Sequence, residues 1–256
     1  MNIFVIQYDH KRAERCKKRT VMTLNERQQK ILNILKEERS ASVADLSARL
    51  FISEATIRRD LTEMKDLGLL ERTHGGAILC ENAEEISIFI RMNKNAVEKE
   101  RAVTNALPLI PPFQSVFVDS SSTALALAER MELAHKTVVT NNLQAAIQLS
   151  KKRDIHLIVL GGSVQYNTVS ATGSLAVRLL RELSFDLMIC SCAAVRNGEA
   201  LERSLEQKEI KTTALSRSKH RILVFDDSKY EAHGIHKIAD LADFDAVATN
   251  APSDGQ

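Results

Sequence analysis

Short apolar runs alternate with helical patterns in the last two thirds of the chain, and this alternation limits the folds that the chain can adopt. Six runs have the length of buried strands, and helical spacing of apolar residues separates several of them. Strands that are apolar on both faces and joined through helices are typical of a mostly parallel α/β sheet. We expect strands at 115–119, 137–140, 156–160, 186–192, 221–226 and 245–249, with helices at 124–133, 143–151, 175–183 and 206–216.

Three short helices are predicted nearer the N-terminus. Apolar residues at helical spacing predict helices at 26–38 and 43–50, separated by a polar break at 39–42. A third helix begins after Ser53, whose hydroxyl can cap it, and ends at Gly68. The buried positions expected on this helix are Ile57, Leu61, Met64 and Leu67.

A hairpin follows the third helix. The apolar runs at 69–72 and 77–80 flank residues 73–76, which include two glycines and suit a turn. Three helices followed by a small hairpin in so short a segment indicate a winged helix-turn-helix.

These patterns divide the chain into an N-terminal extension at 1–21, a winged-helix domain at 22–80 and an α/β domain at 84–251. The net charge of +2 selects no partner by itself. Residues 1–21 hold six basic and two acidic side chains and show no regular pattern. Two interpretations stay open: these residues form a basic arm that touches DNA phosphates, or Met22 is the true first residue.

Composition excludes several classes of protein. The chain has 256 residues, of which 44% are hydrophobic and 27% charged, as in ordinary globular proteins. Its apolar runs are far shorter than the roughly 18 residues of a membrane helix, and residues 3–6 precede the basic cluster, unlike a secretory signal. We therefore expect a cytoplasmic protein without a membrane span. Cys190 and Cys192 lie in an apolar run and are predicted to be buried strand residues rather than half of a metal site, and we expect no cofactor.

The exposed side of the third helix carries side chains suited to DNA. In a helix-turn-helix the second helix of the pair enters the major groove, where Arg58 and Arg59 can bind guanine or phosphate and Thr56 can reach a base or a phosphate oxygen. The alternative is that both arginines are merely solvated, with Arg59 paired to Glu63. We favour DNA binding because the three helices, the cap and the hairpin occur together. The predicted contact residues are Ser53, Glu54, Thr56, Arg58, Arg59, Arg72 and His74.

The same region resembles a known family. Residues 56–61 read Thr-Ile-Arg-Arg-Asp-Leu, and together with Gly-Leu-Leu at 68–70 and His-Gly-Gly-Ala at 74–77 they look like the signature of the DeoR family of bacterial transcription regulators. The likeness extends over residues 24–250. It implies double-stranded operator DNA as a partner, a homo-oligomer (dimer or tetramer), and a sensor domain that is similar to ribose-5-phosphate isomerase and CoA transferases and binds a phosphorylated sugar.

Polar side chains follow four of the predicted strands, at 119–123, 140–142, 161–162 and 226–229. Because ligands of open α/β sheets bind beyond the carboxyl ends of the strands, we expect these loops to converge on one edge. Hydroxyls and free amides at a helix N-terminus suit an anion, and a small polyol phosphate fits this lining. Each residue also has a plain structural role as a cap, a turn or a solvated charge.

The resemblance extends to individual positions of this pocket. It implies that the loop at 119–123 holds phosphate, that Glu206 and Lys211 form a pair facing the pocket, and that Lys229 matches a late Ser-Lys of the family. Ser121 departs from the family, which usually has glycine there. The predicted ligand-binding set is Asp119, Ser120, Ser121, Ser122, Thr123, Thr140, Asn141, Gly161, Gly162, Glu206, Lys211 and Lys229.

The sequence therefore predicts a transcription regulator, specifically a repressor of a carbohydrate-use operon that a phosphorylated sugar releases or modulates. Two alternatives stay open. One is an isomerase-like enzyme, whose general base would be Asp119, Asp186, Glu206 or Asp226. The other is an activator that senses an unphosphorylated metabolite. The fused DNA-binding segment favours a sensor over an enzyme.

Overall fold

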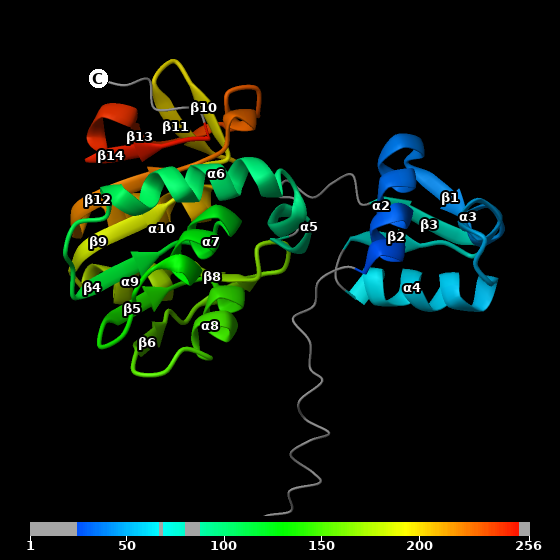
Figure 1. Ribbon diagram of the computed structural model, residues 1–256, viewed down its shortest axis with the longest axis horizontal. Coiled ribbons are helices and arrows are strands. Elements are labelled where there is room, and N and C mark those ends of the chain that lie inside the picture. Colours follow the sequence, from blue (N-terminus) through cyan, green and yellow to red (C-terminus); the bar gives the residue numbers. More distant parts are fainter. Residues whose placement is uncertain (1–24, 67–68, 80–87, 251–256) are drawn as a thin grey trace, which may run out of the picture. The chain divides into compact units, whose positions relative to one another are not determined.

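The computed structural model describes residues 25–66, 69–79 and 88–250 (Figure 1). The described residues up to Lys65, together with Leu70–Leu79, form one compact unit, and the rest form a second. In these described ranges no helix is both long and apolar enough to cross a membrane. The expected features at 1–21, 67–68 and 81–83 lie outside the described residues.

The N-terminal unit contains the three predicted helices and the predicted hairpin. Its buried side chains include Ile31, Leu35, Ile57, Leu61 and Met64, at the helical spacing that the sequence shows. The elements are α2 (Glu26–Glu38), β1 (Ser40–Ser42), α3 (Val43–Leu50), α4 (Glu54–Asp66), β2 (Leu70–Arg72) and β3 (Gly76–Leu79).

The polar break predicted at 39–42 does separate α2 from α3, but it also contains a strand that was not predicted. Strand β1 lies there and pairs antiparallel with β3, so that the sheet has three strands in the order β1-β3-β2. Its three residues are Ser-Ala-Ser, which offer no apolar alternation by which to recognise a strand. The close approach of β1 also requires Gly76, because a Cβ at this position would lie 2.1 Å from the carbonyl oxygen of Ala41.

The second unit is built on a six-stranded sheet in which all neighbouring strands are parallel. From the central strand β4 the chain passes outward to β5 and β6, then returns to β9 on the other side of β4 and continues outward again. The gap between β4 and β9 is therefore the point where the strand order reverses. In spatial order the strands are β14 (Ala246–Ala248), β12 (Ser218–Val224), β9 (Phe185–Cys190), β4 (Ser115–Val118), β5 (Thr137–Thr140) and β6 (His156–Val159).

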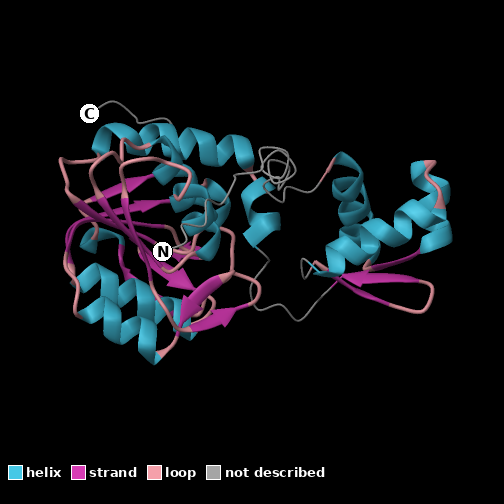
Figure 2. Cartoon of the chain, turned by 90° about the horizontal axis from the view of Figure 1, so that it is seen from below, coloured by secondary structure: helices cyan, strands magenta, loops and turns pink. Residues whose placement is uncertain are grey.

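Helices cover both faces of this sheet, and Figure 2 shows the strands between them. One face packs against α6 (Ala96–Ala106), α7 (Ser122–Arg130) and α8 (Leu143–Leu149), and the other against α9 (Ser174–Arg181) and α10 (Leu205–Ser216). All six predicted strands and four predicted helices are confirmed within a few residues. Helix α6 and the short α5 (Ile88–Asn93), which contacts α7, were not predicted.

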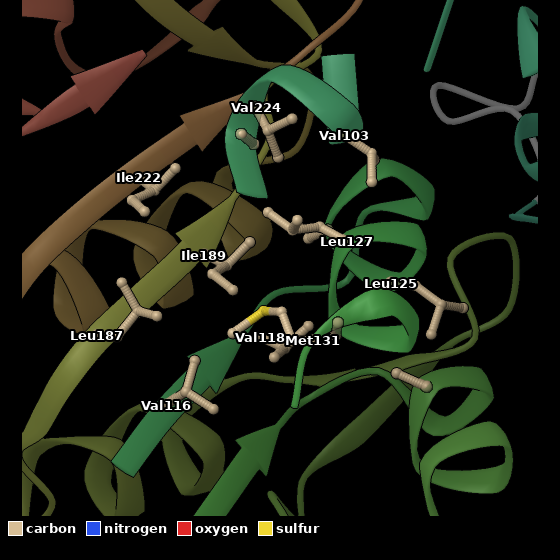
Figure 3. Packing of buried hydrophobic residues seen from close by; sticks show 14 of the residues in the cluster. Val103, Val116, Val118, Leu125, Leu127, Met131, Leu187, Ile189, Ile222 and Val224 are labelled. Atoms are coloured by element: carbon tan, nitrogen blue, oxygen red, sulfur yellow. The ribbon is translucent and has the colours of Figure 1, made fainter. Parts of the chain in front are cut away.

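Alternation along the strands divides the core into two clusters. Val116 and Val118 of β4 belong to the cluster under α6 and α7, with Leu127 and Ile189 (Figure 3), whereas Phe117 between them belongs to the cluster under α9 and α10. Cys190 and Cys192 are buried free thiols in the second cluster, which confirms the predicted burial, but Cys190 is the last residue of β9 and Cys192 lies beyond the strand.

Smaller sheets complete the second unit. The hairpin of β7 (Ser163–Gln165) and β8 (Ser170–Thr172) follows β6. A three-stranded antiparallel sheet combines β10 (Ala194–Arg196), β11 (Glu199–Glu202) and β13 (His236–Asp240).

Candidate functional site

The exposed face of α4 carries charged side chains held by partners one turn away. Arg58 lies 2.6 Å from Glu54, and Arg59 lies 3.4 Å from Glu63, both in i,i+4 ion pairs. The hydroxyl of Ser53 accepts from the backbone N–H of Thr56 at 3.4 Å and so caps the helix, as predicted. Such exposed pairs are weak, so either arginine can exchange its partner for a DNA phosphate or a base at small cost.

The opposite face of α4 is fixed to α2 by a buried carboxylate. Asp60 is 2% exposed and accepts from both Nε and Nη2 of Arg27, the latter at 2.8 Å. This paired geometry fixes the rotation of α4 about its own axis. Asp60 is therefore a structural residue within the 56–61 motif.

The hairpin residues of the predicted DNA-binding set differ in their contacts. Nη1 of Arg72 donates to the hydroxyl of Thr62 at 2.9 Å and to the carbonyl of Arg58 at 3.2 Å, which places this guanidinium beside the exposed face of α4. His74 is exposed in the turn between β2 and β3.

The second unit contains a cavity of about 330 Å³ beyond the carboxyl ends of β4, β9 and β12. It lies at the β4–β9 reversal of strand order, where ligands of open α/β sheets bind. Its lining residues are Arg91, Lys94, Asn95, Lys99, Ser121, Ser122, Thr123, Ser191, Cys192, Arg203, Asp226, Ser228, Lys229, Glu231 and Ala232.

The loop between β4 and α7 forms one wall of this cavity. Oδ1 of Asp119 accepts from the backbone N–H of Ser121 at 2.9 Å and from its hydroxyl at 2.6 Å, while the Ser121 Oγ accepts from the N–H of Ala124 at 3.1 Å. Ser121 is thus the N-cap of α7, and the first turn of the helix, with Ser122 and Thr123, lines the cavity. Amides at a helix N-terminus favour an anion.

A buried ion cluster supports this loop from beneath. Nζ of Lys211 on α10 lies 2.9 Å from Asp119 and 3.5 Å from Glu202, and it donates to the carbonyl of Ser191 at 2.7 Å. Burial alone lowers the pKa of Lys211, but the two carboxylates raise that pKa above its ordinary value, so the side chain stays charged. Burial raises the pKa of the Cys192 thiol to about 12, which leaves it protonated and unreactive.

Cationic side chains outnumber carboxylates around the cavity. Lys99 is 6% exposed, and burial together with the nearby charge of Lys229 lowers its pKa to about 8. Burial likewise lowers the pKa of Lys229. Among the described residues that line the cavity, five are cationic and two, Asp226 and Glu231, are carboxylates. The arrangement favours an anionic ligand with more than one charge.

Four residues of the predicted ligand-binding set line this cavity, namely Ser121, Ser122, Thr123 and Lys229. Asp119 and Ser120 lie behind them: the hydroxyl of Ser120 donates to Gln207 at 2.7 Å, away from the cavity. Lys211 is also behind the wall, and its carboxylate partners are Asp119 and Glu202, whereas Glu206 accepts from the Ser204 hydroxyl at 2.7 Å. The expected Glu206–Lys211 pair is therefore replaced by a Glu202–Lys211 pair.

The loops after β5 and β6 do not line this cavity, because both strands lie on the far side of β4. Thr140 and Asn141 are fully buried, and Nδ2 of Asn141 donates to the carbonyl of Ala171 on β8 at 3.1 Å. Gly161 and Gly162 are exposed at the start of the β7–β8 hairpin. The four loops share one edge of the sheet, as expected, but only two of them reach the cavity.

Several lining residues were missed by sequence reasoning. Arg91, Lys94, Asn95 and Lys99 come from α5 and the start of α6, for which no helical pattern was recognised. The two lysines of this segment, Lys94 and Lys99, could have indicated an anion site. Arg203 follows β11 and had no local motif to mark it.

Comparison with known proteins assigns both units. The model of the DeoR-like helix-turn-helix domain matches residues 27–83, and that of the DeoR C terminal sensor domain matches residues 94–251. The chain belongs to the DeoR family. Relatives of the chain are named as transcriptional regulators, which supports a DNA-binding regulator over the isomerase-like alternative.

Three relatives show which kinds of regulator the chain is similar to. The HTH-type transcriptional regulator GolR of Listeria innocua is 31% identical over 88% of this chain and 90% of its own length. The L-fucose operon activator of Haemophilus influenzae is 31% identical over 88% and 91%, and the glycerol-3-phosphate regulon repressor of Escherichia coli is 29% identical over 90% and 92%. Ribose 5-phosphate isomerase A from Methanocaldococcus jannaschii aligns over 54% of this chain and 55% of its own, with 13% identity and a TM-score of 0.36.

Proposed function

We propose that this DeoR-family protein represses genes of carbohydrate use and that a phosphorylated sugar, bound in the cavity at α7, lowers its affinity for operator DNA. The observation that carries the proposal is the meeting of the α7 N-terminus with five cationic side chains in one cavity. In this proposal residues 22–80 bind DNA, with α4 in the major groove, and residues 84–251 sense the effector. The protein acts as a dimer or tetramer on a symmetric operator.

A phosphate on the first turn of α7 would contact Ser122 and Thr123, both of which line the cavity. Lys99 and Lys229 neutralise its charge, and the remaining volume accommodates the carbon chain of a small sugar. The effector shifts the protein between two states only by its difference in affinity for them, so the DNA-bound state must bind it less tightly.

The test combines effector binding with DNA release. A panel of sugar phosphates and their unphosphorylated sugars is titrated into the full-length protein by calorimetry, and then into its complex with the DNA upstream of its own gene. We expect one or more phosphates to bind and to release the DNA, and the parent sugars to do neither. Binding of an unphosphorylated sugar alone would contradict the proposed ligand class.

Activation is the second candidate, because one relative is named as an operon activator. The two mechanisms differ in sign: an effector of an activator tightens DNA binding, or leaves it unchanged while transcription rises. A reporter gene behind the same upstream DNA separates them, since deletion of a repressor raises expression and deletion of an activator lowers it.

A single substitution links the cavity to the response. Thr123→Val removes a hydroxyl from the first turn of α7 and keeps the side-chain shape, so we expect weaker effector binding with unchanged DNA affinity. The matched control is Thr212→Val on α10, which does not line the cavity. An unchanged effector response in Thr123→Val would remove this turn from the ligand site.

A further inference from the structure

The first described segment after the N-terminal unit contributes directly to the cavity. Helix α5 begins at Ile88, following residues 80–87, and α6 begins at Ala96. Four lining residues come from this short stretch, namely Arg91, Lys94, Asn95 and Lys99. The chain thus passes from the DNA-binding unit into the wall of the cavity before it enters the sheet.

Polar contacts at the cavity hold this segment against the rest of the sensor. Nζ of Lys99 donates to the carbonyl of Arg91 and to the hydroxyl of Ser122 at 3.1 Å, and Ser122 in turn donates to the same carbonyl at 3.3 Å. The hydroxyl of Ser122 therefore joins α5, α6 and the first turn of α7. A ligand at α7 touches the group that fixes α5.

A second set of contacts fixes the α5–α6 junction to the loop that follows β12. Nδ2 of Asn95 donates to Oδ1 of Asp226 at 3.0 Å and to the hydroxyl of Ser228 at 2.9 Å. Asn95 has a left-handed backbone (φ 53°) and makes no side-chain cap for α6, so its amide serves this contact instead. All three residues line the cavity.

Two lining groups in this region have unused hydrogen-bonding atoms. Nε and Nη2 of Arg91 are buried and have no acceptor among the described residues, and Oδ2 of Asp226 is buried there without a donor. Buried polar atoms are ordinarily paired, so this combination indicates a ligand that supplies both partners. Anionic oxygens satisfy the guanidinium, and a hydroxyl donates to the carboxylate.

We propose that the effector is a hydroxyl-bearing organic phosphate that binds Arg91 directly and thereby fixes residues 88–99 on the cavity, which makes this segment the element that reports occupancy to the DNA-binding unit. This inference rests on the proposed function, because it assigns the regulation of the same cavity. Arg91 takes an anionic oxygen, Asp226 takes a hydroxyl, and the segment becomes more ordered when both contacts form.

The experiment follows two quantities in the full-length protein with glycerol 3-phosphate as the probe, since it carries a phosphate and neighbouring hydroxyls, and with inorganic phosphate for comparison. Calorimetry gives the dissociation constant, and hydrogen–deuterium exchange gives the protection of residues 88–99. For the wild type we expect tighter binding of glycerol 3-phosphate than of inorganic phosphate, with slower exchange in 88–99 when the probe is bound.

Three variants separate this inference from the proposed function. In Arg91→Gln we expect the dissociation constant to rise at least tenfold, with loss of the probe-induced protection at saturating probe and of DNA release. Lys229→Gln, in the loop after β12, weakens binding but keeps the protection at saturation. The control Arg101→Gln, on the exposed side of α6, behaves as wild type.

Each outcome tests either the proposed function or the role of Arg91. If the wild type binds neither these probes nor any phosphate of the panel, the proposed function fails. If Lys229→Gln weakens binding but Arg91→Gln binds and protects as wild type does, the cavity stands and the role of Arg91 is wrong. Should Arg91→Gln lose its circular dichroism signal, Arg91→Lys replaces it: this variant keeps the charge but loses the paired donors, so an undiminished affinity and protection would overturn the inference.

Discussion

The charged groups of the two units are held in opposite ways. On α4 the arginines are exposed and paired one turn away, with 55% of the Arg58 side chain and 83% of the Arg59 side chain accessible. At the cavity, charged atoms are buried: Lys99 is buried and has a pKa lowered to about 8, Lys211 behind the wall is fixed between two carboxylates, and Nε and Nη2 of Arg91 are buried without an acceptor among the described residues.

This difference corresponds to two kinds of recognition. Exposed arginines with weak partners exchange them freely, which suits a surface that must bind and leave DNA. Buried cations destabilise the empty site and gain strongly when an anion arrives, which suits a small site whose occupancy must shift a conformational equilibrium.

The largest effect is expected at the buried ion cluster. Lys211→Met leaves Asp119 and Glu202 buried without their cation, and breaking such a pair costs about 3–5 kcal/mol in the free energy of unfolding. Urea denaturation followed by circular dichroism measures it. The control Lys219→Met removes an exposed pair with Asp186 and should cost less than about 1 kcal/mol. Equal losses in both variants would contradict the contrast.

Arg58→Ala should act on DNA binding and leave folding intact. A base contact by arginine contributes about 1–3 kcal/mol, so we expect operator affinity to fall by about tenfold to a hundredfold. If Arg58 binds phosphate instead, the slope of log affinity against log salt should fall by about one. Fluorescence anisotropy at several salt concentrations distinguishes the two. Lys30→Ala on α2, outside the helix-turn-helix pair, is the control, and an equal loss there would remove Arg58 from the interface.

The affinity of the cavity for a phosphate ester should depend on pH. Because the pKa of Lys99 is about 8 and that of Lys229 is also lowered, both lose charge as pH rises, whereas the ester stays dianionic above about pH 7.5. Affinity should therefore fall several-fold between pH 7.5 and 9.5. The nearby charges of Arg91 and Lys94 contribute to the lowered pKa of Lys99, whereas hydrogen bonds and nearby lysines outweigh the effect of burial and lower the pKa of Asp226. Calorimetry with Lys99→Met should give a flatter profile.

The lowered pKa of Lys99 also predicts that the stability of the ligand-free protein changes with pH. The folded pKa of Lys99 lies below its ordinary value of 10.5, so between pH 8 and 10.5 the unfolded chain binds more protons than the folded one. This group therefore destabilises the fold below pH 8, and that penalty is relieved as pH rises through the window. If the pKa of Lys99 is lowered in the folded protein, the urea concentrations that half unfold the wild type and Lys99→Met should converge as pH rises.

The smallest effect is expected for Arg59→Gln. The lost pair with Glu63 is exposed, so the free energy of unfolding should change by about 0.5 kcal/mol or less. DNA affinity should nevertheless fall measurably, since the guanidinium faces outward. A large loss of stability with normal DNA binding would show that Arg59 is a structural residue and not a contact.

The elements with clear periodicity could be predicted from the sequence, and those held by backbone contacts could not. Buried strands such as β4 and β9 are apolar on both faces, and α4 has a stripe of apolar residues with a serine cap, so both kinds were recognised. Strand β1 is three small residues that gain their structure from pairing with β3. Helix α5 is short and was recognised by no pattern.

The sequence predicted some of the residues that line the cavity but not the arrangement of the strands around it. Local sequence marks a loop at the carboxyl end of a strand, which located Ser122 and Lys229. It does not tell on which side of β4 a strand will lie, and this order separates Asn141 from the cavity. Local sequence also does not show which carboxylate reaches Lys211 on α10. Glu202 lies on β11 in the three-stranded sheet, and only the folding of the chain brings it near Lys211.

The paired contact between Arg27 and Asp60 has a consequence for how such a regulator can change its target. Because this contact sets the rotation of α4 from its buried side, the outward positions of the helix contribute little to the fold. Substitutions at those positions can alter the preferred DNA sequence while the helix keeps its place. The exposed positions of α4 can therefore differ between paralogous regulators at little cost to the stability of the fold.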